Sequence, residues 1–463
     1  MQTILKSLYW ILLQELSIKL VSFATSLVLL WYLSPTQFGS FFFVWLFFSA
    51  FAVWRNGGTQ ETIILFGKNN PEQWQTHFWQ IQLKSAYALI LLVGLLIFDD
   101  FIFGYSISCS LWVAMALIFI FEGLYIVPLY IGEVQKDFKI IFRWHLLAEC
   151  MASFTGIVLA SKGQGVYALC AKMIVSACIK TVSMWGSFYF PLRKFSLNIS
   201  KAENKFGNPL SYTKLLNFIA RNIDDFMIGR YLGDAVLGLY NRVYNISLYP
   251  FLQLGSAVNR ALLPEAETLV KNGDAALFLK LFSFNLYVYS MSALALYWWG
   301  PTIVLHYLPE MWHSAASLFQ IFAGILFLQG LSRPNSVFFT LSGDTALELK
   351  LNVILKIFTI ISLSTGIFLF KNINMVVWCY LISVVVSAML QWAFLTRLLG
   401  LPLRWWESAF WHTAFIAFFW IIFQNGFILT PFPTGFLLIG LVIFKLVFFD
   451  KHLVSNWKSF LKN

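Results

Sequence analysis

The sequence predicts an all-α, polytopic membrane protein with about 14 transmembrane helices. Three observations lead to this prediction. Of the 463 residues, 59% are hydrophobic and only 11% are charged, whereas soluble domains carry about 25% charged residues. Apolar stretches long enough to cross a bilayer recur along the whole chain. The loops between these stretches concentrate lysine and arginine on one side, as loops of membrane proteins do. The composition therefore excludes a large soluble domain.

Each predicted helix is a window of about 20 mainly apolar residues. The approximate centres are Phe23, Phe47, Leu91, Ile118, Phe154, Val175, Ile223, Leu248, Tyr289, Gly324, Ile361, Val385, Phe418 and Leu441. The longest hydrophilic segment follows the sixth of these windows and divides the chain. We therefore expect an N-terminal six-helix bundle, a cytoplasmic linker, a C-terminal six-helix bundle, and two additional helices with a cytoplasmic tail, at 1–190, 191–211, 212–400 and 401–463.

The basic residues predict how the chain is oriented. Loops on the side of the N-terminus hold most of them, among them Lys136, Lys139, Arg143, Lys201, Lys205, Arg397, Arg404 and Lys451. The opposite loops hold only about three, Lys162, Arg230 and Lys371. Both termini are therefore predicted to be cytoplasmic. The net charge of +11 is explained by these loops, so no nucleic-acid partner is predicted. No signal peptide is expected to be removed, because the N-terminus lacks a basic region followed by a cleavage site.

A weak internal repeat relates the two halves. The residues Tyr32-Leu33-Ser34 followed by Phe38-Gly39 recur as Tyr231-Leu232-Gly233 followed by Leu237-Gly238, at an offset of 199. Six predicted helices separate the copies, so both have the same orientation in the membrane. This arrangement predicts a parallel repeat about an axis along the membrane normal.

Polar residues also recur on one helical face in each half. In the first predicted helix these residues are Glu15, Lys19, Ser22 and Ser26. The same positions shifted by 199 are Lys214, Phe218, Arg221 and Asp225. Residues spaced by three and four lie on the same face of a helix. Two equivalent helices with polar faces predict a shared hydrated interior.

Charges at the middle of the seventh predicted helix have two interpretations. Arg221 can pair with Asp224 or Asp225 at a spacing of three or four residues. Alternatively, Arg221 lines a cavity and binds an anion, because its guanidinium stays charged and forks onto phosphate oxygens. Arg242, in the eighth predicted helix, has no acidic neighbour on its own helix. A hydrated cavity suits it better than lipid.

The sixth predicted helix carries a second basic stripe, Lys172, Ser176 and Lys180. Glu122 and Glu149, on the two preceding predicted helices, are candidate partners, so Lys–Glu pairs between helices are one interpretation. Together, however, the charges predicted inside the membrane include more basic than acidic residues. A cationic cavity between two six-helix halves implies an anionic ligand.

Several other sites are not predicted. No GxxxxGK[ST] loop occurs, so the chain contains no P-loop ATPase, and no ATPase subunit is implied. His306, Glu310 and His313 share one loop but fit no zinc spacing. The five cysteines have no paired spacing. We therefore expect no metal, no cofactor and no catalytic residues.

The central stretch resembles a known family. Its matching residues are Asn222-Ile223-Asp224, Ile228-Gly229, Leu232-Gly233, Leu237-Gly238 and Tyr240, with further matches at Leu263-Pro264, Tyr307 to Ala315, and Leu341-Ser342-Gly343 to Asn352. This pattern is similar to that of the Wzx-type polysaccharide or O-antigen flippases. These belong to the multidrug/oligosaccharidyl-lipid/polysaccharide exporter superfamily. A weaker match covers Leu33 to Ile64. The chain departs from the pattern at Arg242, where small residues are more usual, and at Arg55.

The resemblance implies a fold and a function. The implied fold has two pseudo-symmetric six-helix bundles around a central cavity, plus two C-terminal helices. The implied substrate is a polyprenyl-pyrophosphate-linked oligosaccharide, flipped across the bacterial inner membrane from its cytoplasmic to its periplasmic leaflet. Further implied partners are the bilayer, a polysaccharide polymerase and chain-length proteins. We expect alternating access and no enzymatic activity.

We assign the substrate's pyrophosphate to basic residues of the predicted cavity. Arg221 and Arg242 are the expected contacts, with Lys19, Lys180 and Arg55 as supporting cations. Asp224, Asp225 and Glu15 are candidates for proton coupling or for ion pairs.

Two other functions remain open at this point. One is a multidrug or small-molecule exporter of the same superfamily, although such cargo is often cationic. The other is a membrane polysaccharide polymerase or ligase. Enzymes of that class usually need a large periplasmic loop, and the outer loops predicted here are short.

Overall fold

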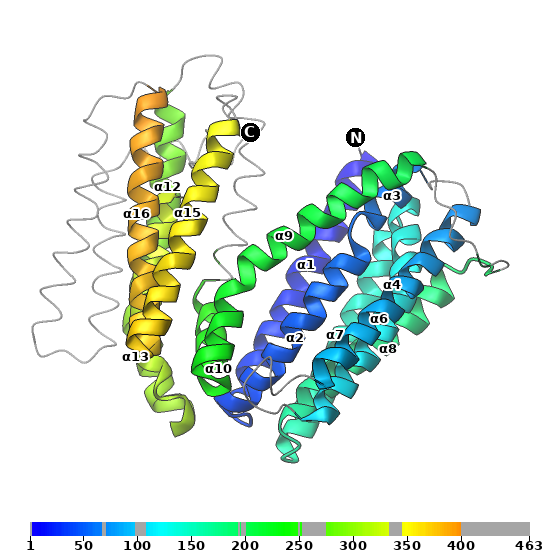
Figure 1. Cartoon of the computed structure of the whole chain (residues 1–463), viewed down its shortest axis with the longest axis horizontal. Coiled ribbons are helices and arrows are strands. Elements are labelled where there is room, and N and C mark those ends of the chain that lie inside the picture. Colours follow the sequence, from blue (N-terminus) through cyan, green and yellow to red (C-terminus); the bar gives the residue numbers. More distant parts are fainter. Residues whose placement is uncertain are drawn as a thin grey trace, which may run out of the picture. The chain divides into compact units, whose positions relative to one another are not determined.

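The computed structural model describes residues 2–66, 71–97, 108–192, 195, 201–248, 251, 275–332 and 345–399. Within these ranges all regular structure is helical (Figure 1). The helices are α1 (Gln2–Leu29), α2 (Pro35–Asn56), α3 (Thr59–Phe66), α4 (Pro71–Ile97), α6 (Cys109–Gln135), α7 (Phe138–Ser161), α8 (Val166–Ser187), α9 (Lys201–Leu232), α10 (Asp234–Ser247), α12 (Ala275–Tyr307), η1 (Glu310–Trp312), α13 (Ala315–Ser332), α15 (Thr345–Thr365), η2 (Gly366–Phe370) and α16 (Ile373–Leu399).

The described ranges contain eight helices that are long and apolar enough to cross a membrane. These are Tyr9–Leu29, Pro35–Leu65, Glu72–Ile97, Cys109–Gln135, Phe138–Ser161, Val166–Ser187, Lys350–Phe370 and Ile373–Gln391. The protein is therefore a multi-pass membrane protein, as predicted. The predicted helix centres from Phe23 to Ile223 and from Tyr289 to Val385 lie inside helices. Leu248 directly follows α10, and the last two centres, Phe418 and Leu441, lie outside the described residues.

The chain divides into two compact units, Met1–Gly238 and Leu239–Asn463. The first unit contains α1 to α9 and the first turn of α10. Part of the predicted linker is regular structure, because the residues from Lys201 onward form the beginning of α9. The predicted division into four segments remains a prediction.

Local sequence sets the limits of α2. Ser34 and Gln37 form a capping box: each side chain accepts a hydrogen bond from the other residue's backbone N–H. Pro35 occupies the first helical position, where a missing N–H costs nothing. The helix ends before Gly57 and Gly58, and the φ of Gly58 is +73°, a conformation that favours glycine.

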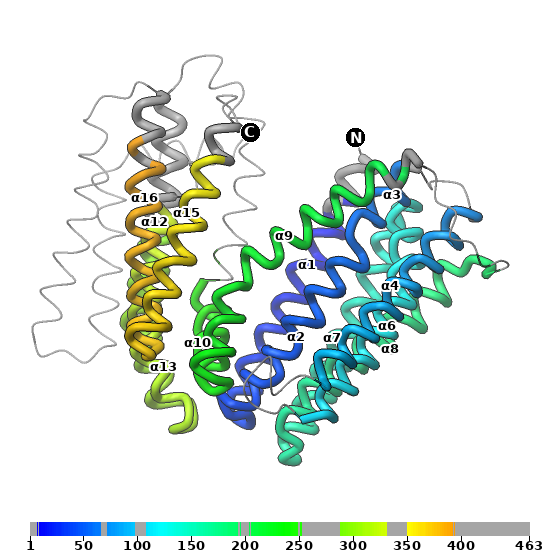
Figure 2. Tube along the Cα trace, in the orientation of Figure 1, coloured from blue at the N-terminus to red at the C-terminus, as the bar shows by residue number. Residues whose placement is uncertain are grey.

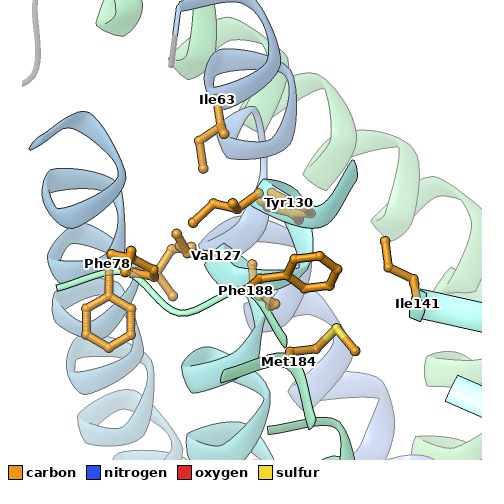
Figure 3. Packing of buried hydrophobic residues seen from close by; sticks show 11 residues of the cluster. Ile63, Phe78, Val127, Tyr130, Ile141, Met184 and Phe188 are labelled. Atoms are coloured by element: carbon orange, nitrogen blue, oxygen red, sulfur yellow. The ribbon is translucent and has the colours of Figure 1, made fainter. Parts of the chain in front are cut away.

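A cluster of buried side chains joins α3, α4, α6, α7 and α8 (Figure 3). Its members include Phe78 and Phe190, and the partly buried Trp185 packs against them. The ring of Phe78 meets those of Trp185 and Phe190 edge-on, at centroid distances of 5.6 and 6.0 Å. Other members are Ile63, Ile81, Ile126, Val127, Tyr130, Ile131, Ile141, Met184 and Phe188. This cluster fixes the relative positions of α6, α7 and α8, which carry four of the five charges described below.

Helix α9 lies along α2 in the first unit (Figures 1 and 2). The ring of Phe226 stacks on Phe43 at 6.1 Å, and Gly229 lies directly against the same ring. Nearer the beginning of α9, Ser211 donates a hydrogen bond to the carbonyl of Gly57. Small residues at these positions allow the two backbones to approach closely, as at many helix interfaces in membranes.

The start of α9 is also held by polar contacts. Glu203 is buried and accepts a hydrogen bond from Gln73 on α4, at 2.9 Å. Lys214 pairs with Glu61 on α3 at 2.7 Å. These contacts fix the end of α9 that lies next to α3 and α4.

In the second unit, α12, α13, α15 and α16 pack as neighbours. Gly366, the first residue of η2, allows close contact with the backbone of Val376 on α16. Ser362 donates a hydrogen bond of 2.7 Å to the carbonyl of Cys379 between the same helices. Phe322 of α13 lies 5.7 Å from the ring of Tyr240 on α10.

Candidate functional site

Five charged side chains gather between the membrane-spanning helices of the first unit. We call Arg55, Glu122, Glu149, Lys172 and Lys180 the interior charge network. They come from α2, α6, α7 and α8. Charges inside a membrane-spanning bundle are costly and mark functional sites by default.

Arg55 lies near the end of α2 with its side chain completely buried. Its Nη2 pairs with Oε2 of Glu122 at 3.3 Å, and its Nη1 donates to the carbonyl of Phe119 at 2.7 Å. Its Nε donates to Asn56 at 2.8 Å, and its guanidinium lies 4.1 Å from the Phe119 ring centroid. All three nitrogens therefore have protein partners. In this conformation Arg55 holds α2 against α6 and positions Glu122.

A second ion pair joins α7 and α8. Nζ of Lys172 lies 3.0 Å from Oε1 of Glu149. The same ammonium lies 3.4 Å from the hydroxyl of Ser22 on α1. The Lys172–Glu149 ion pair is a Lys–Glu pair between helices, which was one interpretation of the basic stripe in the sequence.

Two polar stripes face each other across the α7–α8 hairpin. On α7, His145, Glu149 and Ser153 recur every four residues, and all three are buried. On α8 the stripe is Lys172, Ser176 and Lys180. His145 was not singled out from the sequence. Its Nδ1 lies 3.1 Å from the side-chain amide nitrogen of Gln14 on α1. That amide nitrogen can only donate, so Nδ1 accepts.

Lys180 is the network's excess cation. In the part of the chain that the structure describes, its ammonium has neither an ion pair nor a side-chain hydrogen bond. The carboxylates of Glu122 and Glu149 act on it electrostatically, as does the like charge of Lys172. Three cations therefore face two carboxylates that are already paired with Arg55 and Lys172. Within the described residues the network therefore has one positive charge in excess.

The structure brings together only some of the predicted site residues. Arg55 and Lys180 share Glu122 as an electrostatic neighbour. Lys19 pairs instead with Glu15 on α1, at 3.5 Å, with both side chains more than a third exposed. This exposed pair has one residue of each sign, so it contributes no net charge to the interior.

An ion pair between Arg221 and an aspartate was one of two interpretations of the charges on α9. Arg221 is exposed and makes no ion pair with any residue in the described ranges. Asp225 is buried and Asp224 is half-buried, and both make contacts with other residues.

Arg242 lies on the part of α10 that belongs to the second unit. Its Nη2 donates to the side-chain oxygen of Asn241 at 3.2 Å. Asn245 donates to the same oxygen at 2.8 Å. Asn241 therefore connects Arg242 to Asn245 on the same helix.

Comparison with known proteins gives a consistent assignment. The sequence pattern of the polysaccharide biosynthesis protein family matches residues 28–277. The chain is also 24% identical, over 272 residues, to the succinoglycan biosynthesis transport protein ExoT of Rhizobium meliloti. That match covers 57% of this chain and 53% of ExoT, so the chain spans about half the length of this curated relative.

Two kinds of solved structure share the fold. The lipid II flippase MurJ in an inward closed conformation matches with a TM-score of 0.61 and 14% identity, over 94% of this chain and 99% of that chain. An inward-facing multidrug resistance transporter of the MATE family matches with a TM-score of 0.59 and 17% identity, over 83% of this chain and 94% of that chain. At such identities the similarity concerns the fold alone.

Proposed function

We propose that this chain, which belongs to the polysaccharide biosynthesis protein family, is a flippase for a lipid-linked oligosaccharide in the bacterial inner membrane. The substrate would be a polyprenyl-pyrophosphate-linked repeat unit of O-antigen or another surface polysaccharide. It would cross from the cytoplasmic to the periplasmic leaflet by alternating access, with both termini of the protein in the cytoplasm. The name of ExoT, a transport protein of polysaccharide biosynthesis, supports the substrate class, and the described membrane-spanning helices fit a transporter.

The excess positive charge of the interior charge network carries this proposal. A pyrophosphate is a compact polyanion, and binding it inside a bundle requires cations that are not already neutralised. Lys180 supplies one such cation. Arg55 contributes indirectly, because it occupies Glu122 and so keeps that carboxylate from neutralising Lys180.

The other predicted residues remain proposals from the sequence. We keep Arg221 and Arg242 as contacts of the pyrophosphate and Lys19 as a supporting cation. Asp224 or Asp225 would couple transport to protons. Polymerase and chain-length proteins would act on the product at the outer leaflet.

A multidrug exporter is the second candidate, because the MATE transporter has a similar fold. Charge distinguishes the two functions. A cationic drug requires acidic groups without partners, whereas both carboxylates of the interior charge network are paired with basic residues. The flippase is therefore the better-supported function.

Complementation tests the proposal. Wild-type protein is expected to restore surface polysaccharide in a bacterial strain that lacks its own O-antigen flippase and makes a repeat unit that the protein accepts. Arg221→Ala and Arg242→Ala, compared at equal membrane levels, are each expected to reduce export by about ten-fold or more, because each removes a charge-assisted contact with phosphate.

Several hosts with different repeat units separate substrate mismatch from a wrong function. Failure of wild type in all of them, together with increased resistance to cationic drugs, would establish the exporter instead. If wild type works and both arginine variants work equally well, the two arginines are not pyrophosphate contacts.

A further inference from the structure

Helix α7 carries different side chains on its two sides. An apolar stripe runs along one side at spacings of three and four residues, and its members are all exposed: Ile140, Trp144, Leu147, Met151 and Phe154. Glu149 follows Ile140 by about two and a half helical turns, so it lies on the opposite side of α7. The apolar stripe therefore faces away from the interior charge network. From Ile140 to Phe154 it extends for about 21 Å, which exceeds half of the bilayer's apolar core of about 30 Å.

Three basic residues lie at the beginning of this stripe. Lys136 precedes α7, and Lys139 and Arg143 lie in its first two turns. All three are exposed, and none of them makes an ion pair with a residue in the described ranges. Asp137, also exposed, is the single acidic residue from 136 to 143, so this segment has two positive charges in excess. We call Lys136, Lys139 and Arg143 the basic corner.

Aromatic residues of α1 flank the basic corner, since α1 packs against α7. The ring of Trp10 lies 5.6 Å from that of Phe142, and Nζ of Lys139 lies 5.7 Å from the centroid of the Trp10 ring. Tyr9, which is exposed, meets Trp10 edge-on at 5.3 Å. Tryptophan and tyrosine are enriched at the level of the lipid headgroups. These contacts therefore favour a position of the basic corner at that level.

The turn that carries Lys136 is held by backbone hydrogen bonds. The N–H of Lys136 donates to the carbonyl of Glu133, and the N–H of Asp137 donates to the carbonyl of Gly132, each at 3.0 Å. The φ of Lys136 is +63°, in the left-handed region that favours glycine. A lysine at this position has an energetic cost that a glycine would avoid, and such positions are often retained for function.

We propose that the basic corner binds the phosphate of an anionic phospholipid in the leaflet at this end of α7, with an acyl chain along the apolar stripe. The excess positive charge of the segment complements the single negative charge of a phosphate diester. Basic side chains near the ends of membrane-spanning helices extend to the headgroup level. The ligand is a phospholipid of the bilayer, because the stripe faces away from the interior charge network. The inference does not depend on the proposed function, since lipid binding requires no transport.

Lipid binding by the purified full-length protein tests this inference. The probe is phosphatidylglycerol, titrated into the protein in detergent and counted by native mass spectrometry, with phosphatidylcholine as the neutral comparison. Wild type is expected to prefer phosphatidylglycerol. The variant Lys136→Gly/Lys139→Gln/Arg143→Gln is expected to bind phosphatidylglycerol about ten-fold or more weakly, because each lost cation reduces the attraction to an anionic headgroup. Glycine suits the left-handed backbone at position 136, so the lost binding would not reflect a damaged turn.

A control variant removes the same number of exposed cations elsewhere. Lys162→Gln/Lys205→Gln/Lys350→Gln changes exposed residues at the other end of α7, on α9 and on α15. This variant is expected to bind phosphatidylglycerol as wild type does. Asp137→Asn is expected to strengthen binding, because it removes the negative charge that lies among the cations of the basic corner.

Three results would contradict the inference. Equal binding of the two phospholipids by wild type would show that the protein has no site for an anionic headgroup. Equal losses in the two triple variants would show that net charge alone determines binding. If a polyprenyl phosphate at the same concentration displaces phosphatidylglycerol, the basic corner is a substrate site and the assignment to a bilayer phospholipid is wrong.

Discussion

Lys180→Gln is expected to reduce export of surface polysaccharide by about ten- to a hundred-fold at unchanged membrane levels. The amide keeps most of the side chain's volume and removes its charge. A hydrogen bond to a charged group contributes about 1.5–3 kcal/mol, which corresponds to this range of rates. Because Lys180 has no ion pair in the described part of the chain, its loss leaves no carboxylate without its existing partner.

Lys84 on α4 provides a matched control. It is also a half-buried lysine of a membrane-spanning helix, but it is not part of the interior charge network. Lys84→Gln is expected to export normally, and Lys180→Arg is expected to keep most of the activity. The measurement is surface polysaccharide per unit of membrane protein. Equal losses in Lys180→Gln and Lys84→Gln would show that any lysine inside the bundle has this effect, and the proposed role of Lys180 would be wrong.

Glu122→Leu is expected to destabilise the purified protein by about 3 kcal/mol. Removing one member of a buried pair leaves the other charge without compensation, which costs about 3–5 kcal/mol. Glu122 is 24% exposed, and the remaining partners of Arg55 stay in place, so the lower end applies. The measurement is the thermal unfolding midpoint in detergent.

Two comparisons isolate the charge effect. Glu133, on the same helix, accepts a hydrogen bond of 2.7 Å from the neutral amide of Gln60, so Glu133→Gln leaves no charge stranded. We expect its cost to be about 1 kcal/mol. The double variant Arg55→Met/Glu122→Leu is expected to recover most of the stability, because well-packed apolar residues replace buried ion pairs at little cost. If Glu122→Leu costs no more than Glu133→Gln, the Arg55–Glu122 pair does not stabilise the bundle.

The helices could be predicted from sequence because their signal is local. An apolar window of about 20 residues reports a membrane span without any knowledge of its neighbours. The stripe of Lys172 and Lys180 could be recognised from the sequence for the same reason, because residues eight positions apart lie on nearly the same face of a helix. Its partners were then limited to the few carboxylates on the preceding helices, and Glu149 is one of these.

The specific pairings could not be predicted, because they join residues far apart in the chain. Arg55 and Glu122 are separated by 67 residues, and Gln14 and His145 by 131. Nothing local distinguishes such partners from other polar residues. Local spacing suggested a pair between Arg221 and an aspartate, yet Arg221 is exposed without an ion pair in the described ranges. Arg221 stays in an exposed position, where an ion pair contributes about 1 kcal/mol or less, too little to fix its flexible side chain.

The packing of α9 on α2 has a consequence for biosynthesis. Ser211 and Gly57 are in contact although 154 residues separate them. The face of α2 that packs against α9 therefore stays uncovered until α9 has been synthesised. At about 5–20 residues per second, the 154 residues from Gly57 to Ser211 take about 8–30 s to be synthesised. During that interval the inserted helices present Phe43 and the two glycines after α2 to lipid or to an insertion factor. Nascent chains halted in this window are the ones most exposed to quality-control proteolysis.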